Sequence, residues 1–242
     1  MSLTDWLQAY YKLDEWSWTT AFDSVGSNDW TASTSNILWK TWKINNSAEF
    51  NSSNRNITFP SWIRNALQNT SFSVSAWIKP NSTWENWTWR ICAWRSNSPA
   101  SPWFIFFSDW TSSIWWQVII NWNIWEARGA NNQILLNEWN FVVMTYDKSS
   151  WVIKLYSWWN EIVYQTKTNR ANWVVFDTLR IWDDIFDARA FDWKIDEVWI
   201  WNRVLTQAEI TELYNNWDGL QYWQPWFWWD VIKRTNIFFK NN

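Results

Sequence analysis

Carboxylates are the residues in this sequence with the clearest catalytic potential. A retaining glycosidase needs two of them about 5–5.5 Å apart, flanking one glycosidic bond. Asp183, Asp184 and Asp187 cluster in a predicted turn. Asp196 and Glu197 are neighbours in a predicted strand, where successive side chains point to opposite faces. Neither group is naturally aimed at a single bond, so the sequence does not favour hydrolysis.

The composition excludes several other mechanisms. The chain has no histidine, which rules out Ser-His-Asp and Cys-His nucleophiles and histidine-ligated zinc. Its one cysteine, Cys92, cannot form an internal disulfide. The residues around it, 90–93, have a strand pattern, which favours a small buried side chain over a nucleophile. We therefore predict that the protein is not an enzyme.

Binding is the alternative to catalysis. A sugar site combines a stacking aromatic ring with a few fixed polar groups, and four polar loops can supply such groups, at 90–101, 109–113, 126–133 and 183–189. The candidates for carbohydrate binding within these loops are Arg95, Arg128, Asn131 and Arg189. The same residue types are also common in ordinary solvated loops.

Charge and hydropathy argue against two other classes of partner. The 20 basic and 23 acidic residues give a net charge of −3 and are spread along the chain without a basic block, so we expect no nucleic-acid partner. The N-terminal stretch lacks the basic start and apolar run of a secretory signal. No stretch reaches about 18 consecutive apolar residues, so we also expect no membrane insertion.

Short strand patterns recur along the chain and predict an all-β, antiparallel two-sheet sandwich. In 72–78, large residues alternate with small or polar ones, which is typical of a strand with one buried face. The predicted strands are 7–13, 57–59, 72–79, 104–107, 116–120, 141–146, 152–156, 162–165, 178–181 and 195–201.

One helix is expected near the C-terminus. Thr206 and Glu209 form a capping box, and Ile210, Leu213 and Tyr214 follow at helical spacing. A second short helical turn is expected within 63–68. The composition changes after Gly219, so we predict one domain at 1–217 and a flexible C-terminal tail at 218–242.

Tryptophan replaces glycine in an unusual way. The chain has 32 Trp and only 3 Gly in 242 residues, whereas average usage would give about 17 glycines. Many of the tryptophans stand where turns ask for glycine, as in the predicted hairpin Ser157-Trp158-Trp159-Asn160, after Asn28-Asp29 at Trp30, and after the helix at Trp217. A genuinely tryptophan-rich protein would not explain the missing glycine. We infer that UGA codons for glycine have been read as tryptophan.

Several stretches together resemble the LamG-like jelly-roll family of the concanavalin A-like lectin/glucanase superfamily. LQAYYKLDE and AFDSVGSND are similar to its opening strand and turn, and SFSVSAWIKP, NEWNFVVMTYD and IKLYSWWNEIV to its central strands. FDWKIDEVWIWNRVLTQAEITELY resembles its closing strand and capped helix. The resemblance spans about residues 7–217 and implies glycine at many printed tryptophans. These include Trp16 or Trp18, Trp30, Trp42, Trp151, Trp158, Trp159, Trp182 and Trp193.

The resemblance also implies a possible structural calcium ion near the first turn and the closing strand. The ligands would be Asp23, Asn28 and Asp196, which offer hard oxygen donors. The same side chains can instead form local Asx turns, or in the case of Asp196 an ion pair with Arg203.

The resemblance favours a noncatalytic, lectin-like module that binds carbohydrate or glycoprotein, outside the cell or at its surface. The catalytic motif E-x-D-x-x-E that enzymes with this fold typically carry is absent, so a glycan hydrolase is the least favoured function. A part of a phage tail fibre or another virion component is the alternative, because the domain starts almost at the first Met and no signal is visible. The oligomeric state is left open.

Overall fold

The structure of the protein is a computed structural model. It describes residues 1–15, 20–32, 38–41, 43–50, 57–58, 63, 66–67, 70–81, 88–95, 103–109, 114–120, 123–150, 152–166, 178–181 and 193–221.

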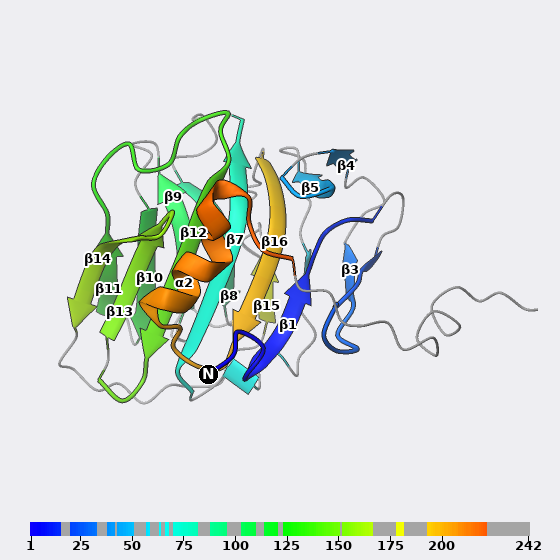
Figure 1. The fold of residues 1–242 in the computed structure, drawn as a ribbon. Coiled ribbons are helices and arrows are strands. Elements are labelled where there is room, and N and C mark those ends of the chain that lie inside the picture. The colour runs from blue at the N-terminus through cyan, green and yellow to red at the C-terminus, as the bar shows by residue number, and fades with distance from the viewer. Residues whose placement is uncertain are drawn as a thin grey trace, which may run out of the picture.

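Two antiparallel sheets face each other, which confirms the predicted all-β jelly-roll sandwich (Figure 1). The first sheet has the order β14-β13-β12-β7-β16-β5-β4, with β1 paired to β16, and both of its ends are open. Its strands are β1 (Leu7–Tyr11), β4 (Leu38–Thr41), β5 (Asn46–Phe50), β7 (Phe72–Pro80), β12 (Asn140–Asp147), β13 (Val152–Ser157), β14 (Asn160–Thr166) and β16 (Trp193–Trp201).

The second sheet lies behind the first in the view of Figure 1 and has the order β11-β10-β9-β8-β15-β6-β3-β2. Its strands are β2 (Thr20–Ala21), β3 (Trp30–Ala32), β6 (Ile57–Thr58), β8 (Thr88–Arg95), β9 (Trp103–Asp109), β10 (Ile114–Ile120), β11 (Asn123–Arg128) and β15 (Thr178–Ile181).

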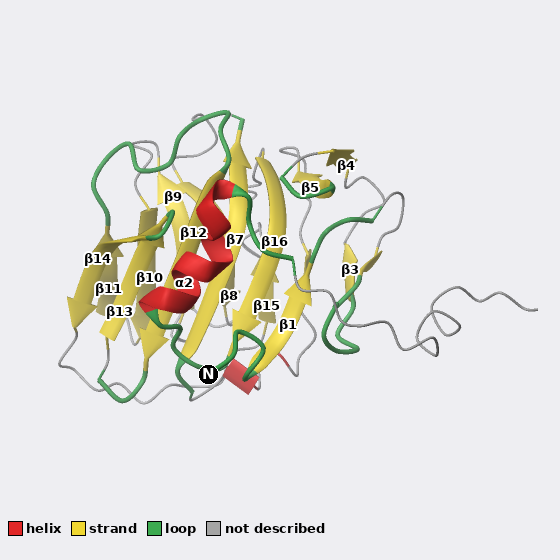
Figure 2. Ribbon diagram, in the orientation of Figure 1, coloured by secondary structure: helices red, strands yellow, loops and turns green. Residues whose placement is uncertain are grey.

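A short helix, α2 (Gln207–Tyr214), covers the outer face of the first sheet (Figure 2). The predicted capping box is confirmed: the Thr206 side chain accepts a hydrogen bond from the Glu209 N–H, and the Glu209 carboxylate accepts one from the Thr206 N–H (2.8 Å). The buried residues of α2 include Ile210, Leu213 and Tyr214, the three that follow the capping box at helical spacing.

The central strands are buried on both faces because the sandwich covers one and α2 the other. On the helix side, Trp77 of β7 packs against Phe141 of β12 and against Tyr214 of α2, with ring centroids 5.1 and 5.8 Å apart. The small Ser73 lets the chain after β16 approach closely, and its hydroxyl donates to the Arg203 carbonyl (2.7 Å). The alternation in the sequence therefore separates large from small side chains as much as buried from exposed ones.

β16 changes its neighbour half-way along. On the edge away from β7, Ile195 pairs with Ala48 of β5, whereas Val198 pairs with Tyr11 of β1. Between these pairs β16 carries an extra residue relative to β7, and Glu197 adopts a positive φ of 52°. This β-bulge places two adjacent carboxyl groups at the junction of three strands.

The described residues contain all ten predicted strands and several that the sequence did not reveal. The strands not predicted are β2, β3, β4, β5 and β11, whereas β8 contains the strand pattern recognised at 90–93. Trp30, which was expected in a turn, is instead the first residue of β3 and is fully buried against Tyr11. Helical structure is present at Ile63, Ala66 and Leu67, as expected for 63–68.

Two of the suspicious tryptophans do lie in left-handed backbone. The hairpin between β13 and β14 pairs Ser157 with Asn160, and Trp158 at its first central position has a φ of 64°. Trp217, which ends the 3₁₀ turn after α2 (Asn215–Trp217), has a φ of 82°. Trp16, Trp18, Trp42, Trp151 and Trp182 lie outside the described residues.

The start of the predicted tail packs on the domain. Gly219 has a φ of 75°, and a Cβ at this position would lie 2.7 Å from the Ile44 side chain and 3.0 Å from that of Trp77. A glycine is therefore required here. Gln221 then hydrogen-bonds to the first sheet, as described below, and residues 222–242 lie outside the described part of the chain.

Candidate functional site

The turn after β1 is held by Asp23, which is fully buried. Its Oδ1 accepts hydrogen bonds from the N–H groups of Tyr10 and Val25, both 3.1 Å, and its Oδ2 accepts one from Nδ2 of Asn28 at 2.7 Å. A Cβ at Gly26 would lie 2.6 Å from both Asp23 Oδ2 and Asn28 Nδ2. The glycine thus leaves room for the Asp23–Asn28 pair, which closes the turn.

Each of the three candidate calcium ligands has hydrogen-bond partners within the protein. Asn28 presents an N–H to Asp23, and both oxygens of Asp23 accept from N–H donors. Asp196 instead accepts from the backbone of Ile44 (2.9 Å) and of Glu197 (3.0 Å). Among the described residues, no group of three or more His, Cys, Asp or Glu side chains is placed to hold a metal ion. Calcium binding stays a prediction.

The bulge in β16 brings Asp196 and Glu197 to the same covered face, in contrast to the opposite faces that regular alternation predicts. Asp196 lies opposite Trp77, whose ring is on the helix side. Glu197 accepts from Nε2 of Gln221 (2.7 Å), which also reaches Asp14 (3.3 Å). Because Glu197 is in the left-handed region, the strand does not alternate here.

The surroundings of these acids favour their protonated forms. Burial, followed by the nearby charge of Glu197, raises the pKa of Asp196 well above its usual range. Burial also raises the pKa of Glu197 to about 8, although hydrogen bonds from Tyr10 and Gln221 act in the opposite direction. Burial likewise raises the pKa of Asp14. The Asp196–Glu197 pair therefore keeps a proton near neutral pH.

These carboxyl groups are closed to a substrate. Asp196 is 0% and Glu197 1% exposed, and Glu197 is covered by the side chains of Tyr10 and Gln221. A polysaccharide cannot reach either group without displacing the residues above them. The arrangement holds β1, β16 and the chain after α2 together.

The end of β16 carries a second set of buried charges. Arg203 forms a two-bond ion pair with Glu209 (2.7 and 2.9 Å) and donates to the backbone carbonyls of Asp5 (2.8 Å) and Ser2 (3.0 Å). Although burial acts to raise it, the pKa of Glu209 is lowered by hydrogen bonds from Arg203 and Thr206. This ion pair fixes the N-terminal segment and the start of α2 at one end of the sandwich.

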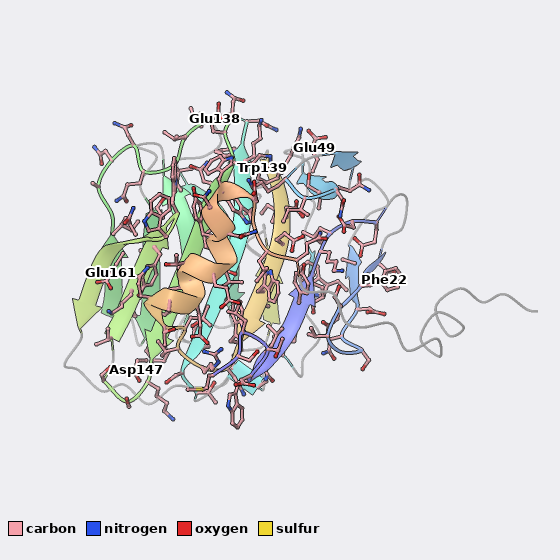
Figure 3. All side chains as sticks on the ribbon, viewed as in Figure 1. Phe22, Glu49, Glu138, Trp139, Asp147 and Glu161 are labelled. Carbon is pink, nitrogen blue, oxygen red and sulfur yellow. The ribbon has the colours of Figure 1, made fainter. Side chains whose placement is uncertain are left out.

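A cavity of about 560 Å³ opens at this same end, where β12 and β16 finish. Figure 3 shows Asp147 at this end of the molecule, with Glu138 and Trp139 at the opposite end. The volume is within the usual range for small-ligand sites. We call it the end cavity, and its lining residues are Met1, Trp6, Thr70, Ser71, Asp147, Asn202, Arg203 and Val204.

The polar groups of the end cavity differ in how many hydrogen bonds they form with the protein. Asp147 accepts from the N–H and hydroxyl of Ser149 (2.9 and 2.7 Å) and from the Ser150 hydroxyl (2.6 Å). Although burial acts to raise it, these hydrogen bonds lower the pKa of Asp147. The Asn202 Oδ1 is buried and accepts no hydrogen bond from the described residues, which costs about 1–3 kcal/mol. The Trp6 side chain beside it is 64% exposed.

The structure does not gather the predicted sugar-binding residues into one site. Arg95 is the last residue of β8 and Arg128 the last of β11, two strands that run in opposite directions with β9 and β10 between them. The two arginines therefore lie at opposite ends of the second sheet. Asn131 is exposed in the turn after β11, and Arg189 lies outside the described residues.

The residues of the end cavity were missed because their sequence signal is weak. Asp147 and Asn202 each follow a predicted strand, the usual position of loop residues with binding roles. That signal is shared by every strand end. Only the fold shows that these two ends meet beside the N-terminal segment.

Comparison with known families gives a match over most of the domain. The model of the family Laminin_G_3, described as the concanavalin A-like lectin/glucanases superfamily, matches residues 51–211. No curated protein matches the chain. Among the described residues, no helix is long and apolar enough to cross a membrane.

Solved structures with this fold include several binding domains. Domain 4 of AbnA, an extracellular GH43 arabinanase from Geobacillus stearothermophilus in complex with arabinotriose, has a TM-score of 0.65 at 19% identity over 85% of this chain and 97% of its own. The botulinum neurotoxin serotype D binding domain has a TM-score of 0.66 at 18% identity over 88% of this chain. The binding domain of Paraclostridial Mosquitocidal Protein 1 has a TM-score of 0.69 at 14% identity over 89% of this chain. The chain spans about half of these two toxin domains, 52% and 53%.

Proposed function

Because the chain belongs to the concanavalin A-like lectin/glucanases superfamily, we propose that it is a noncatalytic module that binds carbohydrate or glycoprotein at a cell surface. The observation that carries the proposal is a contrast within the structure. The paired carboxyl groups of β16 are fully covered, whereas an open cavity at the end of the sandwich presents polar side chains. Such a site can bind a sugar, but it has no exposed carboxylate pair for hydrolysis.

The proposal is tested by glycan binding and turnover measured on the same preparation. We expect the purified protein to retain a subset of a glycan array, and to release no reducing ends from polysaccharides that contain those glycans. Failure to bind any glycan or glycoprotein would refute the binding function. Turnover that is lost in Glu197→Gln would show that the protein is an enzyme.

We also propose that the natural protein carries glycine at the tryptophans with left-handed backbone. Trp6, Trp158 and Trp217 have φ values of 61°, 64° and 82°, and each such residue other than glycine costs about 1–2 kcal/mol. Two buried tryptophans are crowded as well. Trp30 lies against Tyr11 with 3.7 Å between ring centroids. Trp199 stacks on Tyr10 with 3.8 Å between ring centroids, which is closer than the usual 4.5–7 Å.

The gene tests this second proposal directly. We expect TGA codons at positions 158 and 217, whereas TGG at both would refute it. Made with the printed sequence, the protein should gain about 1 kcal/mol of stability from Trp158→Gly. Trp77→Gly is the matched control and should destabilise strongly, because that ring is buried between β7 and α2.

The calcium prediction is tested separately by comparing melting temperatures in calcium and in EDTA. A rise in calcium that disappears in Asp23→Asn would support a bound ion at the opening turn. Identical melting temperatures would refute it.

A further inference from the structure

We propose that the end cavity binds one ring of a neutral sugar, with the side-chain amide of Asn202 as its central polar contact. This inference rests on the proposed carbohydrate-binding function and assigns it to a site. Three observations support it. The Asn202 amide oxygen accepts no hydrogen bond from the described residues, the charges of the cavity lining disfavour an anionic ligand, and apolar side chains lie beside the amide in the lining.

Asn202 is held in place but its side chain is not satisfied. Its backbone N–H donates to the Trp6 carbonyl (3.2 Å), so the main chain is anchored. The Oδ1 has no donor among the described residues. The terminal amide torsion of asparagine is soft, so a modest rotation can turn the oxygen into the cavity. An amide both donates and accepts, which matches two adjacent hydroxyl groups of a sugar.

The charges around the cavity favour a neutral ligand. Arg203 is the cationic side chain of the lining, but its charge is balanced by the bidentate pair with Glu209. It also donates hydrogen bonds to the carbonyls of Ser2, Asp5 and Val204. Asp147 adds a carboxylate to the lining. An acidic sugar would therefore meet the carboxylate of Asp147, whereas the α-amino group of Met1, a residue that is 88% exposed, offers only a solvent-screened positive charge.

The apolar part of the wall can cover a sugar ring. Trp6 is 64% exposed and lies in the lining together with Val204. An indole face packs well against the C–H groups of a pyranose ring. With glycine at position 6, this stacking is lost while the Asn202 contact remains. The two contributions can therefore be separated by mutation.

The test measures binding of neutral monosaccharides and of sialyllactose by calorimetry on the full chain. We expect a neutral sugar to bind, sialyllactose not to bind, and Asn202→Ala to weaken the neutral sugar at least tenfold. Glu138→Gln, at an exposed position at the opposite end of the sandwich (Figure 3), is the matched control and should bind as the unmodified protein does. Melting curves show whether each variant is folded.

The outcomes separate this proposal from the general function. If a sugar binds and Asn202→Ala leaves its affinity unchanged, the assignment to the end cavity is wrong while the carbohydrate-binding function stands. If no sugar or glycoprotein binds, both are wrong. If Asn202→Ala does not fold, Thr70→Val replaces it, because Thr70 also lines the cavity. Unchanged affinity in this variant would also overturn the assignment.

Discussion

Two segments of the closing strand, only five residues apart, use polar side chains in opposite ways. In the middle of β16, Asp196 and Glu197 are like-charged neighbours that burial keeps partly protonated. At its end, Arg203 is paired with the opposite charge of Glu209, and the Oδ1 of Asn202, which lines an open cavity, accepts no hydrogen bond from the described residues. The middle of the strand is closed and the end is accessible.

This difference separates structure from function along one strand. Asp196 and Glu197, the carboxyl groups that suggest catalysis in the sequence, lie at the β-bulge where β5 and β1 meet β16. The residues that contact them, such as Gln221, hold the strands together and leave no room for a substrate. The residue with unused hydrogen-bonding capacity is an asparagine that carries no catalytic signature. Buried acids at a strand junction are thus a poor guide to a site in this fold.

The largest expected effect is at the end of the strand. Glu209→Ala leaves the guanidinium of Arg203 buried without its counter-charge, and breaking such a pair costs about 3–5 kcal/mol. The variant also loses the capping box of α2. We expect the urea midpoint of unfolding to fall accordingly. Glu212→Ala, exposed on the same helix, is the control and should change the midpoint little.

A small loss in Glu209→Ala would show that Arg203 reaches solvent or another acid in the folded protein. Arg203 would then not depend on Glu209 for its counter-charge, and the contrast between the two segments of the strand would not hold. The double variant Arg203→Met, Glu209→Met distinguishes the cases, since replacing both partners by apolar side chains should recover much of the stability.

The second effect concerns the middle of the strand and depends on pH. The pKa of Glu197 is raised from its ordinary value of 4.5 to about 8. Between these pH values the unfolded chain has lost the proton that the folded protein still holds, so stability falls as pH rises from about 4.5 to about 8. Glu197→Gln removes this titrating group and should make the free energy of unfolding less dependent on pH. The free energy of unfolding, measured from pH 5 to pH 9, tests this.

Glu138→Gln is the control for the pH series, because Glu138 is exposed at the far end of β12 (Figure 3). Its curve should match that of the unmodified protein. A slope of the same size in Glu197→Gln would mean that other groups, such as Asp14 or Asp196, account for the pH dependence.

The sequence predicts the regular parts of this fold well and the junctions poorly. Alternation in 72–79 and the Thr206–Glu209 capping box are local signals, and the structure contains both elements. The short strands β2 to β5 escaped because two to five residues give too little periodicity. The shared orientation of Asp196 and Glu197 depends on a bulge, which lies where the neighbour of β16 changes from β5 to β1, two strands that are far away in sequence. The unpartnered Asn202 is likewise a property of the assembled end of the sandwich.

The smallest expected effect is the difference in stability loss between Tyr10→Phe and Tyr11→Phe, two neighbouring positions in β1. The Tyr10 hydroxyl donates to the carboxyl group of Glu197, whereas the Tyr11 hydroxyl donates to the backbone carbonyl of Asn28 (2.8 Å). Each loss on mutation to Phe should cost about 1 kcal/mol, as measured by urea unfolding at pH 5. The Tyr10 bond also lowers the pKa of Glu197, so without it this pKa rises further. Tyr10→Phe should therefore lose more stability than Tyr11→Phe as the pH approaches 9, and equal losses at both pH values would show that Tyr10 and Glu197 are not coupled.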